Sequence, residues 1–200
     1  MLGALREALE PMKQAMARPL ASLGVPPLAV TLGGLLLAVA AAHEIRRGDC
    51  PWAPWLALLA GSADLLDGAV ARLQGRATPF GNYAEALVDR LVEIALLLGL
   101  SPLYPDLVPY ALAGCLFISY CNPRVALVVA TDNRDWRGVG DHVDRMVLLM
   151  VIYLVHSWHL QALARAGLLV LLLVTVVGSG QRLMYARKLI QEAGKGPEHS

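Results

Sequence analysis

The chain has 200 residues, of which 56% are hydrophobic and 16% are charged, and its mean hydropathy is +0.53. An average soluble domain is about 45–50% apolar with glycine included, and about 25% charged. This composition excludes intrinsic disorder and indicates an integral membrane protein. The formal net charge of +1 provides no general attraction for nucleic acid, so we expect no nucleic-acid partner.

The first 24 residues precede the apolar part of the chain. Leu2, Leu5, Leu9, Met12 and Met16 recur at helical spacing, with charged residues between them. This pattern predicts an amphipathic helix that lies in the membrane interface, and an ordinary solvated helix is the alternative. At the other end of the chain, residues 191–200 are expected to form a disordered tail.

Six apolar runs between these ends are long enough to cross a bilayer. A spanning helix needs about 20 mostly apolar residues, and breakers such as Pro51, Pro79 and Pro102 separate the runs. The sequence therefore predicts an all-α integral membrane protein with six transmembrane helices in one domain, residues 25–190. The expected spans are residues 25–42, 52–74, 82–101, 107–130, 143–160 and 163–187.

The distribution of Lys and Arg predicts the orientation of these spans. With six crossings, both termini share one side of the membrane. That side holds all 17 basic residues except Arg46, Arg47 and Arg165. Because basic residues concentrate in cytoplasmic segments, we expect both termini to be cytoplasmic.

Ionisable residues concentrate in the second and third expected spans, where they are costly and tend to mark function. Each span carries one helical stripe of such residues and small residues: Asp64, Asp67, Gly68 and Ala71 on the second, and Gly81, Glu85 and Asp89 on the third. The spacings i, i+3, i+4, i+7 and i, i+4, i+8 each place their residues on one helix face. A short turn separates the two spans, so we expect antiparallel helices whose stripes face each other near the cytoplasmic surface.

Four carboxylates in so confined a place need a counter-charge. Divalent cations fit better than the two nearby arginines, because a cluster of carboxylate oxygens prefers Mg²⁺, Mn²⁺ or Ca²⁺. Four acids can hold two such ions, an arrangement that serves displacement at phosphorus, and Gly68 and Ala71 leave space for a ligand beside them. The alternatives are salt bridges to arginine, or acids that line the path of a divalent-cation carrier.

These stripes resemble the signature of the CDP-alcohol phosphotransferase family, D-x-x-D-G-x-x-A-R followed by G-x-x-x-D-x-x-x-D. The matching positions are Asp64, Asp67, Gly68, Ala71, Arg72, Gly81 and Asp89, with Glu85 where the family usually has an aspartate. Thr31, Ser119, Arg124 and the pair Asp144-Arg145 are also similar to family positions.

The resemblance implies a membrane enzyme that moves the lipid-phosphate group of a CDP-linked lipid, phosphatidyl or archaetidyl, to a polar alcohol and releases CMP. It implies two Mg²⁺ or Mn²⁺ ions, with Asp64, Asp67, Glu85 and Asp89 as ligands. Asp89, which matches the family's last acid, is also the expected general base. The residues expected to bind the nucleotide are Asp64, Gly68, Ala71, Arg72, Thr31 and Gly81.

The expected acceptor site consists of Ser119, Arg124 and Arg145. Because arginine binds phosphate with two parallel hydrogen bonds, this set favours a phosphorylated polyol such as inositol phosphate or glycerol phosphate. The resemblance further implies a homodimer in the plasma membrane of a prokaryote, with its active site on the cytoplasmic side. Glu85 in place of aspartate leaves a catalytically silent family member as an alternative.

Overall fold

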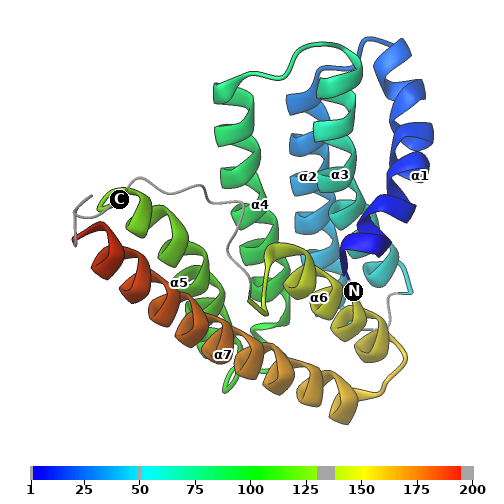
Figure 1. The fold of residues 1–200 in the computed structure, drawn as a ribbon. Coiled ribbons are helices and arrows are strands. Elements are labelled where there is room, and N and C mark those ends of the chain that lie inside the picture. The colour runs from blue at the N-terminus through cyan, green and yellow to red at the C-terminus, as the bar shows by residue number, and fades with distance from the viewer. Residues whose placement is uncertain (1, 49–50, 130–137, 195–200) are drawn as a thin grey trace. The chain divides into compact units, whose positions relative to one another are not determined.

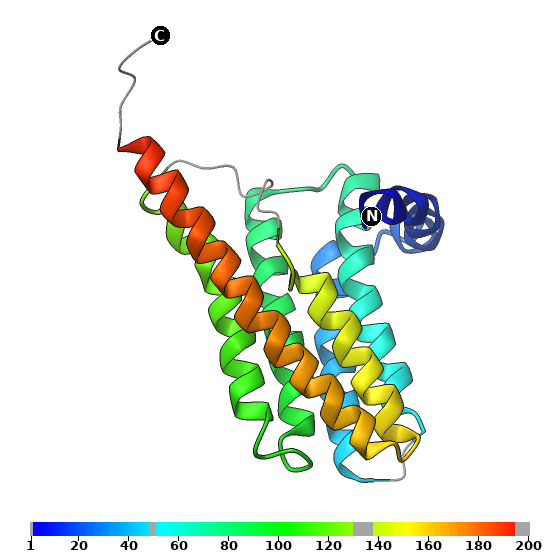
Figure 2. The ribbon, with the colours of Figure 1, turned by 60° about the horizontal axis from the view of Figure 1, so that its bottom comes forward.

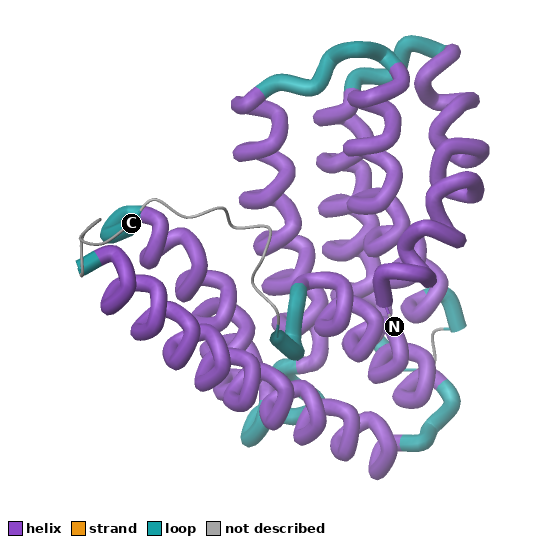
Figure 3. Tube along the Cα trace, viewed as in Figure 1, coloured by secondary structure: helices purple, strands orange, loops and turns teal. Residues whose placement is uncertain are grey.

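The computed structural model describes residues 2–48, 51–129 and 138–194, and all regular structure within these ranges is helical (Figure 3). The helices, in chain order, are α1 (Leu2–Ser22), α2 (Pro27–Arg46), α3 (Ala53–Leu73), α4 (Pro79–Leu100), α5 (Val108–Ala126), α6 (His142–Ser157) and α7 (Gln161–Ala193) (Figure 1). They form two compact units, one with α1–α4 that ends at Pro102 and one with α5–α7 that begins at Leu103.

The six apolar runs coincide with the helices α2–α7, which confirms the prediction of an all-α chain. Two of these helices, α2 and α7, are long and apolar enough to cross a membrane by length and composition. The helices α3 and α4 carry several acids and arginines along their length, and α6 has only 16 residues. The last helix, α7, continues to Ala193, beyond the predicted end at residue 187.

In the first unit, α2 packs against both α3 and α4, whereas α3 and α4 make few contacts with each other (Figures 1 and 2). The helix α1 packs against α3, where Ala17 lies in a small apolar cluster with Ala69 and Val70. The helix α2 therefore holds the first unit together, because both neighbouring helices rest on it.

The contact between α2 and α3 is close because the residues that face each other are small. A Cβ atom added to Gly34 on α2 would lie 2.8 Å from the Cβ of Ala63 and 3.3 Å from the carbonyl oxygen of Ala60 on α3. A larger side chain at position 34 would force the two helices apart.

Polar contacts fix both ends of the turn that connects α3 to α4. The Gln74 side-chain amide, at the end of α3, donates to the carbonyl oxygen of Ala21 (3.3 Å), in the last turn of α1, and to that of Val25 (2.9 Å), in the segment that joins α1 to α2. Thr78 caps the N-terminus of α4, because its hydroxyl accepts a hydrogen bond from the Gly81 N–H at 3.0 Å. The C-terminus of α3 and the N-terminus of α4 are thus well defined.

In the second unit, α7 packs against both α5 and α6. Polar contacts join the segment before α5 to the rest of this unit: the Tyr104 hydroxyl lies 2.8 Å from His156 Nδ1 and donates to the Gln161 carbonyl oxygen at 3.5 Å, and Arg165 forms an ion pair with Asp106. The hydrogen bond from Arg165 holds the pKa of the Asp106 carboxyl below its ordinary value.

We expect the substitution Gly34→Val to destabilise the protein by about 1–3 kcal/mol, because the added atoms meet Ala60 and Ala63 on α3. Gly33→Val is the matched control: it lies on the same helix, and a Cβ there meets nothing within 4 Å. The measurement is the thermal unfolding midpoint of both variants in one detergent. Equal midpoints would contradict the close α2–α3 contact.

Candidate active site

The predicted motif residues of the second span lie on one continuous helix, α3 (Ala53–Leu73). Asp67 is 1% exposed, and Asp64 and Gly68 are half-buried. The helical spacing therefore brings these residues to one face, as the sequence predicts.

Asp67 is held in place by one hydrogen bond to each of its carboxylate oxygens. The Thr31 hydroxyl, on α2, donates to Oδ2 at 2.7 Å, and the Gly68 backbone N–H donates to Oδ1 at 2.6 Å. Each carboxylate oxygen has a second lone pair that can accept a further bond. The structure thus places Thr31, a predicted nucleotide-binding residue, directly against a predicted metal ligand.

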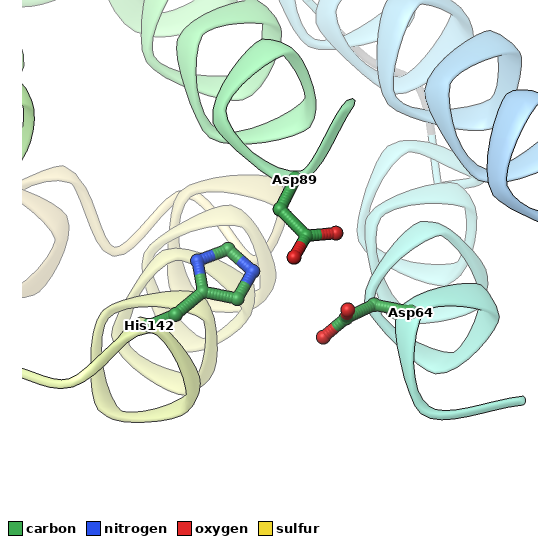
Figure 4. Close-up of side chains that lie close together, drawn as sticks. All are labelled: Asp64, Asp89 and His142. Carbon is green, nitrogen blue, oxygen red and sulfur yellow. The ribbon is translucent and has the colours of Figure 1, made fainter. Parts of the chain in front are cut away.

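Carboxylates of α3 and α4 come together as the sequence predicts. Asp64, Asp67 and Glu85 each offer an oxygen, and these oxygens all lie within 4.8 Å of one another. Asp64 also offers an oxygen within 4.8 Å of one from Asp89, and Figure 4 shows these two side chains pointing toward each other from α3 and α4. (Figure 4 also draws His142, the first residue of α6 in the second unit.) Asp64 is therefore within reach both of Asp67 and Glu85 and of Asp89.

The spacing of these oxygens suits a hard divalent cation. Two oxygens that bind Mg²⁺ from opposite sides are about 4.2 Å apart, since each bond is about 2.1 Å long. Oxygens that all lie within 4.8 Å of one another are close enough for side-chain movement to bring them around one ion. An all-oxygen donor set also matches the preference of Mg²⁺ and Mn²⁺, so the residues present fit such an ion.

One of the nearby arginines already has a carboxylate partner. The Arg90 guanidinium forms an ion pair with Glu93 at 2.7 Å, one turn further along α4, and Glu93 is buried. Arg90 therefore has a carboxylate partner outside the four predicted metal ligands.

A cavity of about 330 Å³ adjoins the acidic cluster within the first unit. Its walls include five of the six predicted nucleotide-binding residues and two of the predicted metal ligands: Thr31, Gly68, Ala71, Arg72, Gly81, Asp67 and Glu85. Asp64 and Asp89 are not among its lining residues. The cavity is therefore bounded by the predicted motif residues of α3, by Thr31 on α2 and by the first turns of α4.

Several cavity residues were not predicted from the sequence. Arg76, Thr78, Phe80 and Asn82 come from the turn between α3 and α4 and from the start of α4. Apart from Asn82, which begins the expected third span, these residues lie where the sequence indicates only a short turn. Its position between the two halves of the motif is the signal that could have identified it, because such a turn must pass beside a site that both halves line.

Gly68 lines the cavity from α3. An added Cβ would lie 3.4 Å from Arg72 Nη1 and 3.6 Å from Glu85 Oε1, which are ordinary contact distances. Packing alone therefore does not require glycine here. The lack of a side chain at position 68 leaves the cavity wider beside Glu85.

In the second unit, two of the three predicted acceptor residues are in contact. Arg145 on α6 is 2% exposed, and its guanidinium donates to the Ser119 hydroxyl on α5 at 3.0 Å and to the Gly140 carbonyl at 2.6 Å. Arg124 is exposed and lines a different hollow, between α5 and α7. The structure therefore separates Arg124 from the other two residues.

A further buried arginine, Arg182 on α7, was not predicted. It is 5% exposed and donates to the carbonyl oxygens of Val139 (3.0 Å) and Gly178 (3.2 Å) and to Asp141 Oδ1 (2.6 Å). These bonds fix the residues that lead into α6, where Arg145 lies. A basic residue in the apolar run of α7 is the signal that could have found it.

Comparisons with known proteins place the chain among lipid-synthesis enzymes of similar sequence. The chain is 24% identical to the archaetidylinositol phosphate synthase of Pyrococcus horikoshii over 96% of this chain and 99% of that protein. It is 30% identical to the phosphatidylinositol phosphate synthase of Mycolicibacterium smegmatis over 73% of this chain and 69% of that protein.

The fold is similar to that of Mycobacterium tuberculosis phosphatidylinositol phosphate synthase. Its crystal structure with manganese and citrate has a TM-score of 0.73 at 24% identity, over 87% of this chain and 88% of that one. Its crystal structure with CDP-DAG bound has a TM-score of 0.70 at 25% identity, over 87% and 92%. The family model described as CDP-alcohol phosphatidyltransferase matches residues 25–178, and the chain belongs to this family.

Proposed function

We propose that this protein transfers the lipid-phosphate group of a CDP-linked lipid to a phosphorylated polyol, with release of CMP. The observation that carries the proposal is the cavity whose walls hold Asp67 and Glu85 beside five predicted nucleotide-binding residues. The related synthases of inositol phosphate lipids support inositol phosphate as the acceptor, with glycerol phosphate as the alternative. The donor is a phosphatidyl or an archaetidyl lipid.

The acidic cluster of α3 and α4 would hold two divalent ions, Mg²⁺ or Mn²⁺. Asp64, Asp67 and Glu85 would hold one ion, and Asp64 and Asp89 would contribute to the second. When bound, such ions neutralise negative charge on a pyrophosphate and on its leaving group. The Thr31 hydroxyl and the Gly68 N–H keep the Asp67 carboxylate in one orientation for this role.

The reaction itself is one displacement at phosphorus. The acceptor hydroxyl oxygen forms a bond to the lipid-side phosphorus, and the bond from that phosphorus to the CMP oxygen breaks. Asp89 takes the hydroxyl proton as general base. The nucleotide would occupy the cavity beside Gly68, Ala71 and Arg72, where the first turn of α4 presents the positive end of its helix dipole.

In the second unit, Ser119 and Arg145 would bind the phosphate of the acceptor. The Arg145 guanidinium is buried and already oriented by Gly140, so it loses little freedom on binding. Arg182 would act as a positioning residue, because it fixes Val139 and Asp141 immediately before α6. Arg124 is left out of this set because it lines another hollow.

We further propose six transmembrane helices, α2–α7, with both termini and the active site on the cytoplasmic side of a prokaryotic plasma membrane. The helix α1 would lie in the interface: Ala17 packs on α3, while Met12 and Met16 are exposed on its surface. The domain would then comprise residues 25–190; of the predicted tail at 191–200, residues up to Ala193 belong to α7 and residues 195–200 lie outside the described part of the chain. Two copies would form a homodimer.

The first test measures CMP release from a CDP-linked lipid by purified protein in the presence of inositol phosphate or glycerol phosphate. We expect release with Mg²⁺ or Mn²⁺, its loss in EDTA and its recovery on adding either metal, because the acidic cluster provides only oxygen ligands. Asp67→Asn should lower the rate by about 100-fold or more.

The control for this test is Asp106→Asn, which removes an exposed carboxylate paired with Arg165 in the second unit and should leave the rate unchanged.

Glu85→Asp should retain or raise activity, whereas a catalytically silent protein would show none in either form. Absence of CMP release by folded protein with both acceptors would refute the proposed function, and metal flux in liposomes would favour a cation carrier.

Gly68→Ala should raise the KM for the CDP-linked lipid by about tenfold while the protein stays folded. The added methyl makes only ordinary contacts but takes space beside Glu85, and alanine favours the helix by about 1 kcal/mol. The unfolding midpoint should therefore be equal or higher. Gly180→Ala, where a Cβ meets nothing within 4 Å, is the matched control on α7. An unchanged KM would show that the nucleotide binds elsewhere.

Arg145→Lys and Arg182→Lys should each raise the KM for the acceptor by several-fold and leave the KM for the CDP-linked lipid nearly unchanged. Lysine keeps the charge but cannot reproduce the two-pronged hydrogen bonding of either guanidinium. Arg165→Lys, at an exposed ion pair, is the control. Equal changes in both KM values would contradict a role specific to the acceptor.

A further inference from the structure

The cavity of the first unit has two ends of different chemistry. At one end, which we call the acid end, Thr31, Asp67 and Glu85 line it from α2, α3 and α4. At the other end, which we call the turn end, the lining comes from the connection between α3 and α4 and from the first turns of α2 and α4 (Figure 1). The metal ions of the proposed reaction, and with them the pyrophosphate of the donor, belong to the acid end.

The cavity is long enough to hold a nucleotide between its two ends. On each of the three helices, the lining extends four residues from the acid end toward the turn, to Pro27, Ala71 and Gly81. Four residues of helix rise about 6 Å, and the turn lies beyond them. The volume of about 330 Å³ is within the range of small-molecule sites. Because a ribose separates the base of a nucleotide from its phosphates, the base would lie toward the turn end.

Three side chains at the turn end have no part in the reaction proposed above. They are Arg76 in the turn and Phe80 and Asn82 at the start of α4. All three are exposed, so each can turn toward a ligand in the cavity. Together they offer a cation, an aromatic face and an amide at the place where the base would lie.

The backbone of the turn fixes the position from which Arg76 reaches the cavity. Gly75 has a φ of +64°, which closes the C-terminus of α3. The Arg76 N–H donates to the Ala71 carbonyl oxygen at 2.9 Å, and the Gly75 N–H donates to that of Arg72 at 3.2 Å. Arg76 is therefore attached to the end of α3 at the edge of the cavity.

A guanidinium can distinguish cytosine from uracil. It only donates hydrogen bonds, and it presents two parallel N–H groups. Cytosine has two adjacent acceptors, N3 and O2, whereas uracil has an N–H at position 3. Arginine binds two adjacent acceptors in the same way when it recognises guanine in DNA. Arg76 would thus form two hydrogen bonds with cytosine but would face a donor in uracil.

Asn82 and Phe80 can bind the base without selecting it. An amide offers both a donor and an acceptor, so Asn82 can bind the amino group at position 4 of cytosine or, after rotation, the oxygen of uracil. Phe80 is 70% exposed, and stacking on an aromatic ring tolerates any base. Selection between the two pyrimidines therefore depends on Arg76.

We propose that Arg76 selects the cytosine base of the donor through hydrogen bonds to N3 and O2, while Asn82 and Phe80 bind the base without selecting it. This inference rests on the proposed function, which places the nucleotide in this cavity. It assigns the choice of nucleotide to the turn between α3 and α4 and not to the acid end.

The test is isothermal titration of the purified full chain with CMP or with UMP in the presence of Mg²⁺. We expect the wild-type protein to bind CMP at least tenfold more tightly than UMP. Arg76→Lys keeps the positive charge but loses the paired hydrogen bonds. It should weaken CMP binding by about 10- to 100-fold and leave UMP binding nearly unchanged. The UMP affinity of this variant is also its internal control for folding.

Two further variants separate base selection from general effects. Asn82→Ala should weaken both nucleotides by similar factors, because the amide serves either base. The matched control is Arg18→Lys, which changes an exposed arginine on α1 that does not line the cavity. This control should bind both nucleotides as the wild type does.

Three results would overturn the proposal: equal affinities of the wild type for CMP and UMP, equal weakening of both nucleotides in Arg76→Lys, or the same change in Arg18→Lys. Equal weakening would assign Arg76 to the attraction of phosphate. CMP release from a CDP-linked lipid separates this proposal from the proposed function. Release without a preference for CMP over UMP refutes only the selection by Arg76, and a preference for CMP without release refutes only the transferase.

Discussion

The hydrogen bond between the Thr31 hydroxyl and the Asp67 carboxylate links the packing of the first unit to its chemistry. A carboxylate that is 1% exposed is costly unless its oxygens have partners. One partner comes from the next residue along the same helix, and the other comes from α2. The orientation of Asp67 therefore depends on how closely α2 approaches α3, which the small residues Gly34, Ala60 and Ala63 determine.

The helix α2 has a structural role that its sequence does not suggest, since it provides none of the four acids. The helices α3 and α4 carry the acids but make few contacts with each other, and both pack on α2. The spacing between the two acidic stripes is therefore set by a third helix. Gln74 adds to this arrangement, because its amide joins the end of α3 to the segment that enters α2.

The sequence predicted the helices and the proximity of the carboxylates, because both depend on local spacing. Apolar runs located α2–α7, and the i, i+3, i+4 pattern placed Asp64, Asp67 and Glu85 on facing helices. It did not predict contacts that depend on how helices pack. Arg124 lies five residues from Ser119 but faces another groove, and Arg182 reaches Asp141 across 41 positions. No periodic pattern contains such information.

The cavity of the first unit is built from neighbouring parts of the chain. All its lining residues lie between Pro27 and Glu85, within three consecutive helices. Contacts between segments close in sequence form early, and domains generally fold as units in the order of their synthesis. The first unit, with its cavity, can consequently assemble while the ribosome is still making α5–α7.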